Sequence, residues 1–158
     1  MAKAMSLSAA LDPILAGCSK ADLPLVLAML ERLAADAYRS WSMDVSDPLE
    51  RAGLEACAAT EFQIAEFIES VEPNAESRLE TLAPLLPRLR AAYASVTEGL
   101  ARMEQFQVQA GGEAGGASLL REFAEAEDGR VAEQYRDFAL AEEANATFLM
   151  SLTGGESR

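Results

Sequence analysis

Apolar residues recur at helical spacing along several long stretches of this sequence, and this periodicity constrains the fold more than any other feature. Around Glu61, apolar residues stand 7 and 4 positions before it and 3, 7 and 10 positions after it: Leu54, Cys57, Ile64, Ile68 and Val71. Residues at these offsets share one face of an α-helix. No stretch alternates between apolar and polar residues as a half-buried strand does. The sequence therefore predicts an all-α fold.

Prolines and glycines indicate where the predicted helices begin and end. A short helix is expected at residues 7–16, and four longer helices are expected at residues 22–43, 47–71, 88–109 and 118–152. Three prolines interrupt the chain between the second and third long helices, which predicts a crossover connection there. The glycine-rich sequence after the third long helix predicts a flexible turn, and a later glycine predicts a bend in the fourth. The whole pattern is typical of a four-helix bundle with one crossover.

The composition predicts one folded domain over residues 1–158, with its core at about 22–152. Half of the residues are apolar, which is enough to bury a core without disulfides. Cys18 and Cys57 have no metal-binding spacing, so reduced thiols in a cytoplasmic protein are expected. The first residues do not resemble a signal peptide, and no apolar run is long enough to span a membrane.

Charge and the absence of histidine narrow the possible functions. The net charge of −13 argues against nucleic acids and anionic membranes as partners, because no basic stripe is present to neutralise phosphates. Without histidine there is no histidine-activated nucleophile and no histidine-ligated metal. No catalytic residue is therefore predicted. Any chemistry would depend on carboxylates, Tyr, Lys, Cys or a cofactor.

A weak internal repeat pairs acidic residues in the two halves of the chain. A shift of 67 residues aligns Glu31 with Glu98 and Glu61 with Asp128, so each half has two acids separated by 30 residues. In an antiparallel hairpin of the first two long helices, Glu31 and Glu61 would meet at the same level, because they stand at similar distances from the turn. Glu142, which is followed at the third position by Asn145, is an alternative to Asp128 as the inward acid of the last helix.

Two helical hairpins that each carry an inward glutamate and a second acid 30 residues later resemble the ferritin-like superfamily, especially its rubrerythrin-type members. The similarity lies in the spacing of Glu31 and Tyr38, in Thr-Glu-Phe-Gln-Ile-Ala-Glu-Phe at 60–67 and in Asp-Gly-Arg-Val-Ala-Glu-Gln-Tyr at 128–135. It covers roughly residues 22–140. The resemblance implies a ferritin-like four-helix bundle, with its long crossover between the second and third helices.

The resemblance also implies a metal centre, from which this sequence departs. The family carries Glu-x-x-His in its second and fourth helices, and its carboxylates and histidines hold a di-iron or di-manganese centre. The corresponding carboxylate positions here are Glu31, Glu61, Glu98 and Asp128. The histidine positions hold Ile64 and Val131, and aliphatic side chains cannot bind a metal. The resemblance therefore implies a vestigial site without a cofactor.

Two alternatives to a vestigial site stay open. The four carboxylates alone could hold a hard cation such as Mg²⁺ or Mn²⁺, or iron. Glu31 and Glu61 could instead be solvated residues at the edge of an apolar face. If they are buried, each acid needs a partner or a proton. The candidate partners are Arg32, Arg102, Arg130 and Gln63.

Two classes of function follow from these interpretations. The missing histidines favour a ferritin-like bundle without enzymatic activity, which acts as a structural module or by association with itself as a homodimer or with another protein. The alternative is an oxidoreductase or metal-storage protein with a di-iron or di-manganese carboxylate centre. A phasin-like helical coat protein is a further alternative.

Overall fold

A computed structural model describes residues 5–154 and divides the chain into two compact units. The first, called here the α2 unit, is Gly17–Arg88, and the second, called the α6 unit, is Met1–Ala16 together with Leu89–Arg158. The described residues form helices and no strand, which confirms the all-α prediction. The elements are α1 (Leu7–Ala16), α2 (Leu23–Asp44), α3 (Pro48–Val71), α4 (Ala75–Leu82), the 3-10 helix η1 (Ala83–Leu85), α5 (Leu86–Thr97), α6 (Arg102–Glu125) and α7 (Gly129–Thr153).

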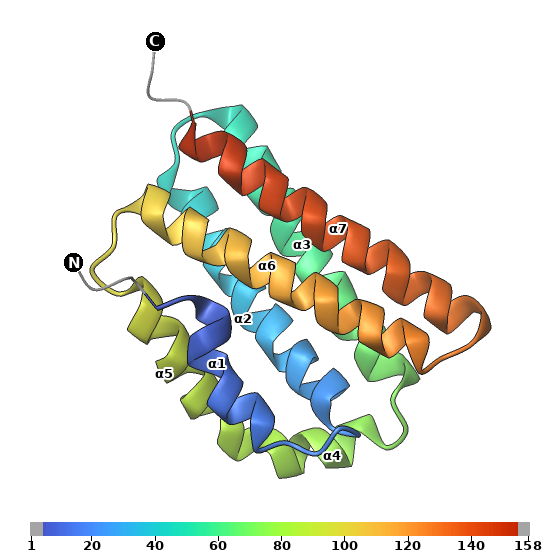
Figure 1. Cartoon of the computed structure of the whole chain (residues 1–158). Helices are drawn as coiled ribbons and strands as arrows, with labels where there is room; N and C mark the ends of the chain where they lie inside the picture. Colours follow the sequence, from blue (N-terminus) through green and yellow to red (C-terminus); the bar gives the residue numbers. More distant parts are fainter. Residues whose placement is uncertain (1–4, 155–158) are drawn as a thin grey trace. The chain divides into compact units, whose positions relative to one another are not determined.

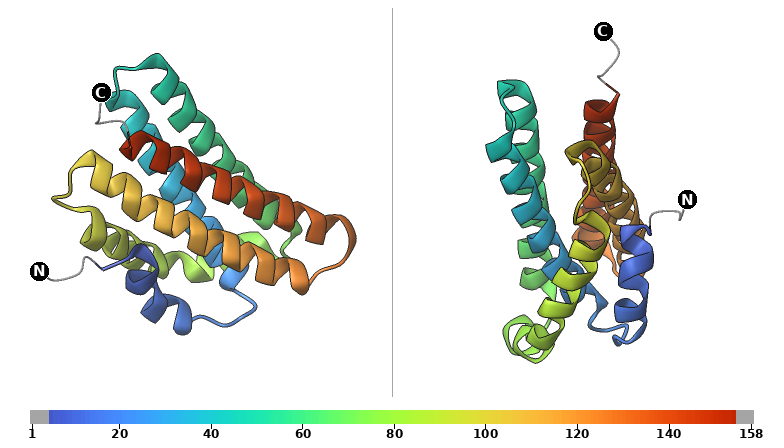
Figure 2. Two further views of the ribbon diagram at one scale, coloured as in Figure 1. Left: turned by 45° about the horizontal axis from the view of Figure 1, so that its top comes forward. Right: turned by 90° about the vertical axis from the view of Figure 1, so that its left-hand side faces the viewer.

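The α2 unit is built on an antiparallel hairpin of α2 and α3, which lie side by side in every view (Figures 1 and 2). The turn is short because Asp47 caps the start of α3, its carboxylate accepting a hydrogen bond from the backbone N–H of Leu49 at 2.8 Å. Pro48 occupies the first turn of α3, where no backbone donor is needed. Helix α3 ends at Val71, just before Pro73. These boundaries match the predicted helices to within one residue.

Arg78 of α4 holds the ends of the α2–α3 hairpin together. Its guanidinium donates to the Asp22 carboxylate at 3.0 and 3.2 Å, beside the start of α2. It also donates to the Glu72 carboxylate at 2.9 Å and to the carbonyl of Pro73 at 3.1 Å, beside the end of α3. The hydrogen bonds that its guanidinium donates to these carboxylates raise the pKa of Arg78, the bond to Glu72 most. One side chain of α4 thus satisfies groups from two other segments of the chain.

The α6 unit is built on a second hairpin, formed by α6 and α7 (Figure 2). Its helix boundaries differ from the predicted ones. The chain breaks after α5, where Gly99 adopts a positive φ of 77°, and again between α6 and α7, where Gly129, the first residue of α7, adopts a φ of 60°. The two breaks separate α5 from α6 and α6 from α7. The prediction of helices at 88–109 and 118–152 is therefore wrong, because each predicted helix runs across one of these breaks.

The glycine-rich sequence at 111–116 lies inside α6 and not in a turn, which corrects the second prediction for this region. Helix α1 packs against α6 at these glycines. A Cβ atom at Gly112 would stand 2.7 Å from Cδ2 of Leu7, and one at Gly115 would stand 3.0 Å from Oγ of Ser8. Helix α1 can approach α6 closely because side chains are missing there, and the contact offsets the poor helix propensity of glycine.

Aromatic contacts lie within the helical core of each unit. In the α2 unit, the rings of Tyr38 and Trp41 meet edge to face with centroids 5.5 Å apart. In the α6 unit, Phe123 and Tyr135 join α6 to α7 with centroids 5.8 Å apart. Such pairs add to the stability that comes from burying the rings. None of the helices in the described part of the chain is both long and apolar enough to cross a membrane.

Candidate metal-binding carboxylates

Glu31 of α2 and Glu61 of α3 are brought together in the α2 unit. Carboxylate oxygens of the two side chains lie within 4.8 Å of one another. Glu31 is 5% exposed and Glu61 is 0% exposed, so both belong to the interior and not to a solvated edge. The predicted meeting of the two acids across an antiparallel hairpin is confirmed, and their placement at a wet edge is wrong.

The helical periodicity explains why these acids are buried. On α2, the positions 4 before and 3, 7 and 10 after Glu31 are all buried: Leu27, Ala34, Tyr38 and Trp41. On α3, the positions 7 and 4 before and 3 and 7 after Glu61 are buried as well: Leu54, Cys57, Ile64 and Ile68. Each glutamate therefore stands in the middle of an apolar face, and the hydrophobic packing of the face carries the carboxylate into the core.

Arg32, a predicted partner for a buried acid, is used elsewhere. Its guanidinium forms a two-point interaction with the Glu69 carboxylate, with N–O distances of 2.9 and 2.7 Å. The hydrogen bond to Glu69 is the main cause that raises the pKa of Arg32. The guanidinium also lies 4.7 Å from the ring centroid of Phe62, at a partly exposed position. Arg32 thus belongs to a surface cluster of the hairpin.

Two carboxylates buried close together cannot both be ionised at low cost without a cation or a proton between them. One oxygen of Glu61, Oε2, is buried and accepts no hydrogen bond within the described chain, although the side chain as a whole has other interactions. A carboxylate pair of this kind is able to share a proton or to bind a positively charged ion.

The α6 unit carries two buried glutamates of its own, Glu113 on α6 and Glu142 on α7. They are 2% and 1% exposed. Gln109, one turn before Glu113, donates from Nε2 to Glu113 Oε1 at 2.7 Å and is itself 3% exposed. Asn145, one turn after Glu142, is 7% exposed. All four of these polar side chains lie on faces that are otherwise apolar.

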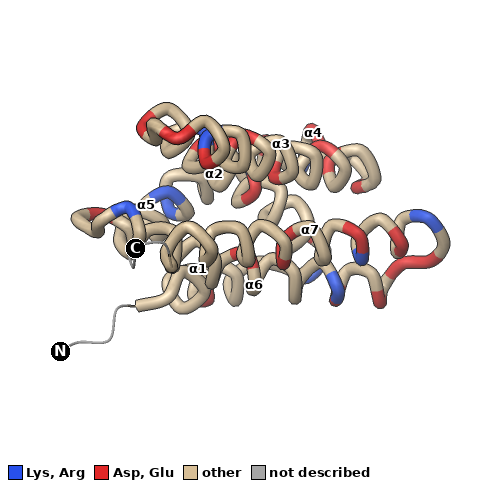
Figure 3. Tube along the Cα trace, turned by 90° about the horizontal axis from the view of Figure 1, so that it is seen from above, with Lys and Arg blue, Asp and Glu red and all other residues tan. Residues whose placement is uncertain are grey.

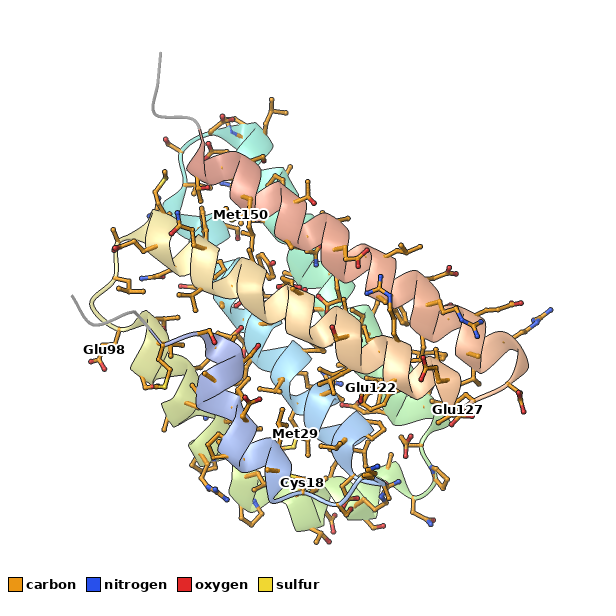
Figure 4. The ribbon with its side chains drawn as sticks, viewed as in Figure 1. Cys18, Met29, Glu98, Glu122, Glu127 and Met150 are labelled. Carbon is orange, nitrogen blue, oxygen red and sulfur yellow. The ribbon has the colours of Figure 1, made fainter. Side chains whose placement is uncertain are left out.

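Glu98 and Asp128 lie outside the helices in which the repeat was expected to place them. Glu98 follows the end of α5 and is exposed, and Figure 4 shows its side chain at that end of the helix. Asp128 precedes α7 and is exposed, in the acidic connection between α6 and α7 that Figure 3 shows. Val131 is part-buried in the first turn of α7. The 67-residue repeat fails because it crosses the misplaced helix boundaries, and the role of these two acids as ligands remains an untested prediction.

The structure indicates a different correspondence between the two hairpins. Glu113 stands 82 positions after Glu31, and Glu142 stands 81 positions after Glu61. Glu142 and Asn145 were recognised from the sequence as an alternative, but Glu113 was missed because it lies among glycines. The signal that could have found it is the set of apolar residues 7 and 3 positions before it and 4 and 7 after it: Phe106, Ala110, Ala117 and Leu120.

The comparisons with known proteins give no family for this chain. No protein-family model matches it, and neither the curated proteins nor the solved structures yield a match. The buried polar residues of the chain are therefore the main indication of its function. Within the described residues these include four glutamates, one glutamine and one asparagine on the long helices of the two hairpins.

Proposed function

We propose that this protein binds divalent metal ions through buried carboxylates, in a ferritin-like helical bundle whose centre lacks histidine. The observation that carries the proposal is the Glu31–Glu61 pair. Its carboxylate oxygens lie within 4.8 Å of one another at two positions that are 5% and 0% exposed. A divalent cation between two such carboxylates would offset their repulsion and the cost of removing them from water.

The energetic comparison with an apolar core favours this function over simple packing. Replacing buried charged groups by hydrophobic residues of similar size is often neutral or stabilises a protein by about 1–4 kcal/mol. A helix pair that only had to pack would therefore gain from leucine at both positions. Ile64, which is fully buried one turn after Glu61, illustrates the residue type that packing alone prefers.

The donor set fits hard cations. Carboxylate oxygens, together with the amide oxygen that an asparagine such as Asn145 provides, suit Mg²⁺ and Mn²⁺, and they also accept iron(II). The absence of histidine and of paired cysteines argues against zinc or copper. Bound manganese or iron would supply redox chemistry. The residues of this chain would bind the ion and exclude water from it, and the proposed activity is metal binding or storage.

The ferritin-like topology is part of the same proposal. It is supported by the order of the elements, in which two long helical hairpins are separated by α4, η1 and α5 where a crossover is expected. It is also supported by the presence of one buried glutamate on each of the four long helices. In the ferritin-like family, inward acids on the bundle helices hold the metal centre. The buried glutamates would serve as such ligands, and Glu98 and Asp128 would not be needed.

Metal content and affinity test this proposal. Protein purified without chelator is analysed for bound metals by mass spectrometry, and Mn²⁺ binding to the metal-free protein is measured by calorimetry. The two pair variants are Glu31→Gln/Glu61→Gln, in the α2–α3 hairpin, and Glu113→Gln/Glu142→Gln, in the α6–α7 hairpin. The matched control is Glu55→Gln/Glu122→Gln, in which both glutamates are exposed. Loss of binding in either pair variant, with normal binding in the control, supports metal binding by the buried glutamates.

A second candidate function is the one that the missing histidines favour: a metal-free bundle that acts as a structural module or by association with itself or another protein. The specific observation in its favour is the aliphatic side chain of Ile64 at the position of a family histidine. This candidate predicts that wild-type protein binds no Mn²⁺ and that each pair variant is at least as stable as wild type. Size-exclusion chromatography with light scattering would then be used to look for a dimer.

A further inference from the structure

A chain of hydrogen bonds runs from α5 to a buried acid of α6, entirely within the α6 unit. The hydroxyl of Tyr93 donates to Oε1 of Gln109. Nε2 of Gln109 then donates to Oε1 of Glu113 at 2.7 Å. Tyr93 is half-buried, while Gln109 and Glu113 are 3% and 2% exposed. The chain therefore connects the edge of the unit with its interior.

The direction of this chain follows from the chemistry of its members. A carboxylate has only acceptors to offer, so the amide nitrogen of Gln109 must face Glu113 and the amide oxygen must face Tyr93. The phenol of Tyr93 is able to donate to that oxygen. Each hydrogen bond polarises the next, which strengthens the one that reaches Glu113. The arrangement holds the Glu113 side chain in one orientation. It is not suited to moving a proton, because an amide does not readily pass one on.

We infer that Tyr93 and Gln109 are positioning residues that hold Glu113 ready to bind a divalent metal ion. This inference rests on the proposed function. Carboxylates and histidines that bind metals are commonly held by hydrogen bonds from a second layer of residues, and removal of such a partner typically weakens metal binding about 10–100-fold. Gln109 fits this role because it is buried beside the acid and contacts it directly. Tyr93 fits it because it fixes which end of the amide faces the acid.

The existence of this hydrogen-bond chain can be tested without metal. In metal-free protein, the side-chain amide signals of Gln109 are assigned by NMR and compared among variants. Glu113→Gln and Tyr93→Phe should each shift those signals, since each removes one hydrogen-bond partner of the amide. Glu122→Gln, at an exposed position nine residues after Glu113 in the same helix, should leave them unchanged. Signals of Gln109 that do not respond to either of the first two variants would overturn the inference, whatever the protein binds.

Mn²⁺ affinity then tests whether the hydrogen-bond chain positions Glu113 for metal binding. Tyr93→Phe and Gln109→Leu should each weaken Mn²⁺ binding about 10-fold or more. Gln107→Leu, an exposed glutamine of the same helix, should not. Unchanged Mn²⁺ affinity in both Tyr93→Phe and Gln109→Leu would overturn the positioning role. If wild-type protein binds no Mn²⁺ while the NMR shifts are seen, the proposed function fails and the positioning role fails with it, although the hydrogen bonds exist. Thermal unfolding of the metal-free variants shows whether a loss of affinity comes from unfolding.

Discussion

Glu31 and Glu61 face each other across an antiparallel helical hairpin, with carboxylate oxygens within 4.8 Å of one another and almost no exposure to solvent. Each acid stands in the middle of an apolar helix face and not at its margin. Folding must therefore move both carboxylates out of water together. Because the two carboxylates lie close together, a bound cation or a shared proton would change the charge of the pair as a whole and not of either residue alone.

The first prediction concerns the energetic cost of this pair. The double variant Glu31→Leu/Glu61→Leu should raise the free energy of unfolding of metal-free protein by about 1–4 kcal/mol, because two buried polar groups are replaced by apolar side chains. It should at the same time abolish any stabilisation of the protein by Mn²⁺. Urea unfolding with and without Mn²⁺ measures both effects. Glu55→Leu, at an exposed position of α3, serves as the control. A less stable metal-free variant would show that the two acids stabilise the fold by themselves.

The second prediction concerns Arg78, which joins α4 to both ends of the α2–α3 hairpin. Arg78→Lys keeps the positive charge but loses the planar fork that donates to several acceptors at once. It should lower the free energy of unfolding by about 1–2 kcal/mol, a value reduced by the partial exposure of the site. Chemical denaturation provides the measurement, and Arg90→Lys on an exposed face of α5 provides the comparison. Equal stability of the two variants would mean that charge alone matters at Arg78.

The third prediction is a pH dependence that arises at Asp22. A hydrogen bond from Ser19, and then one from Arg78, lowers the pKa of Asp22 from its usual 3.8. Because the folded pKa is below the unfolded pKa, the unfolded chain takes up this proton first as the pH falls. The stability contributed by ionised Asp22 should be fully present above the unfolded pKa and be lost as the pH falls through the lowered folded value.

The difference in unfolding free energy between wild type and Asp22→Asn measures this effect. It should be constant between pH 7 and pH 5 and should shrink below about pH 4. Asp137→Asn removes an exposed aspartate of α7 and controls for the change in net charge. A difference for Asp22→Asn that persists unchanged at pH 2 would indicate that its carboxylate charge is not what stabilises the native state.

The sequence predicted the α2–α3 hairpin well because its signals are local. Asp47 and Pro48 mark the start of α3, Pro73 follows its end, and the apolar spacing around Glu31 and Glu61 shows which face is buried. Once a short turn joins two helices of similar length, their antiparallel pairing and the meeting of the two acids follow from helix geometry. None of these steps requires knowledge of a distant part of the chain.

The α6 unit could not be predicted in the same way because its decisive contacts are not local. Glycine disfavours a helix interior, so the sequence at 111–116 predicted a turn and hid Glu113. Only the approach of Leu7 and Ser8, more than 100 positions earlier in the sequence, explains why glycines are accommodated there. With that helix misplaced, the repeat selected Glu98 and Asp128 in place of Glu113 and Glu142.

The last prediction separates the intrinsic cost of these glycines from their role in packing. Gly111 and Gly112 are neighbours in α6. A Cβ atom at Gly111 meets nothing within 4 Å, whereas one at Gly112 would stand 2.7 Å from Cδ2 of Leu7.

Gly111→Ala should raise the free energy of unfolding by about 0.5–1 kcal/mol, the usual gain from replacing glycine inside a helix. Gly112→Ala should gain less than Gly111→Ala, because the Leu7 side chain must move. Gly112→Val should be destabilising, because the larger side chain displaces α1. Thermal unfolding of the three variants measures this order, and equal gains for the two alanine variants would show that α1 does not pack against α6 at Gly112.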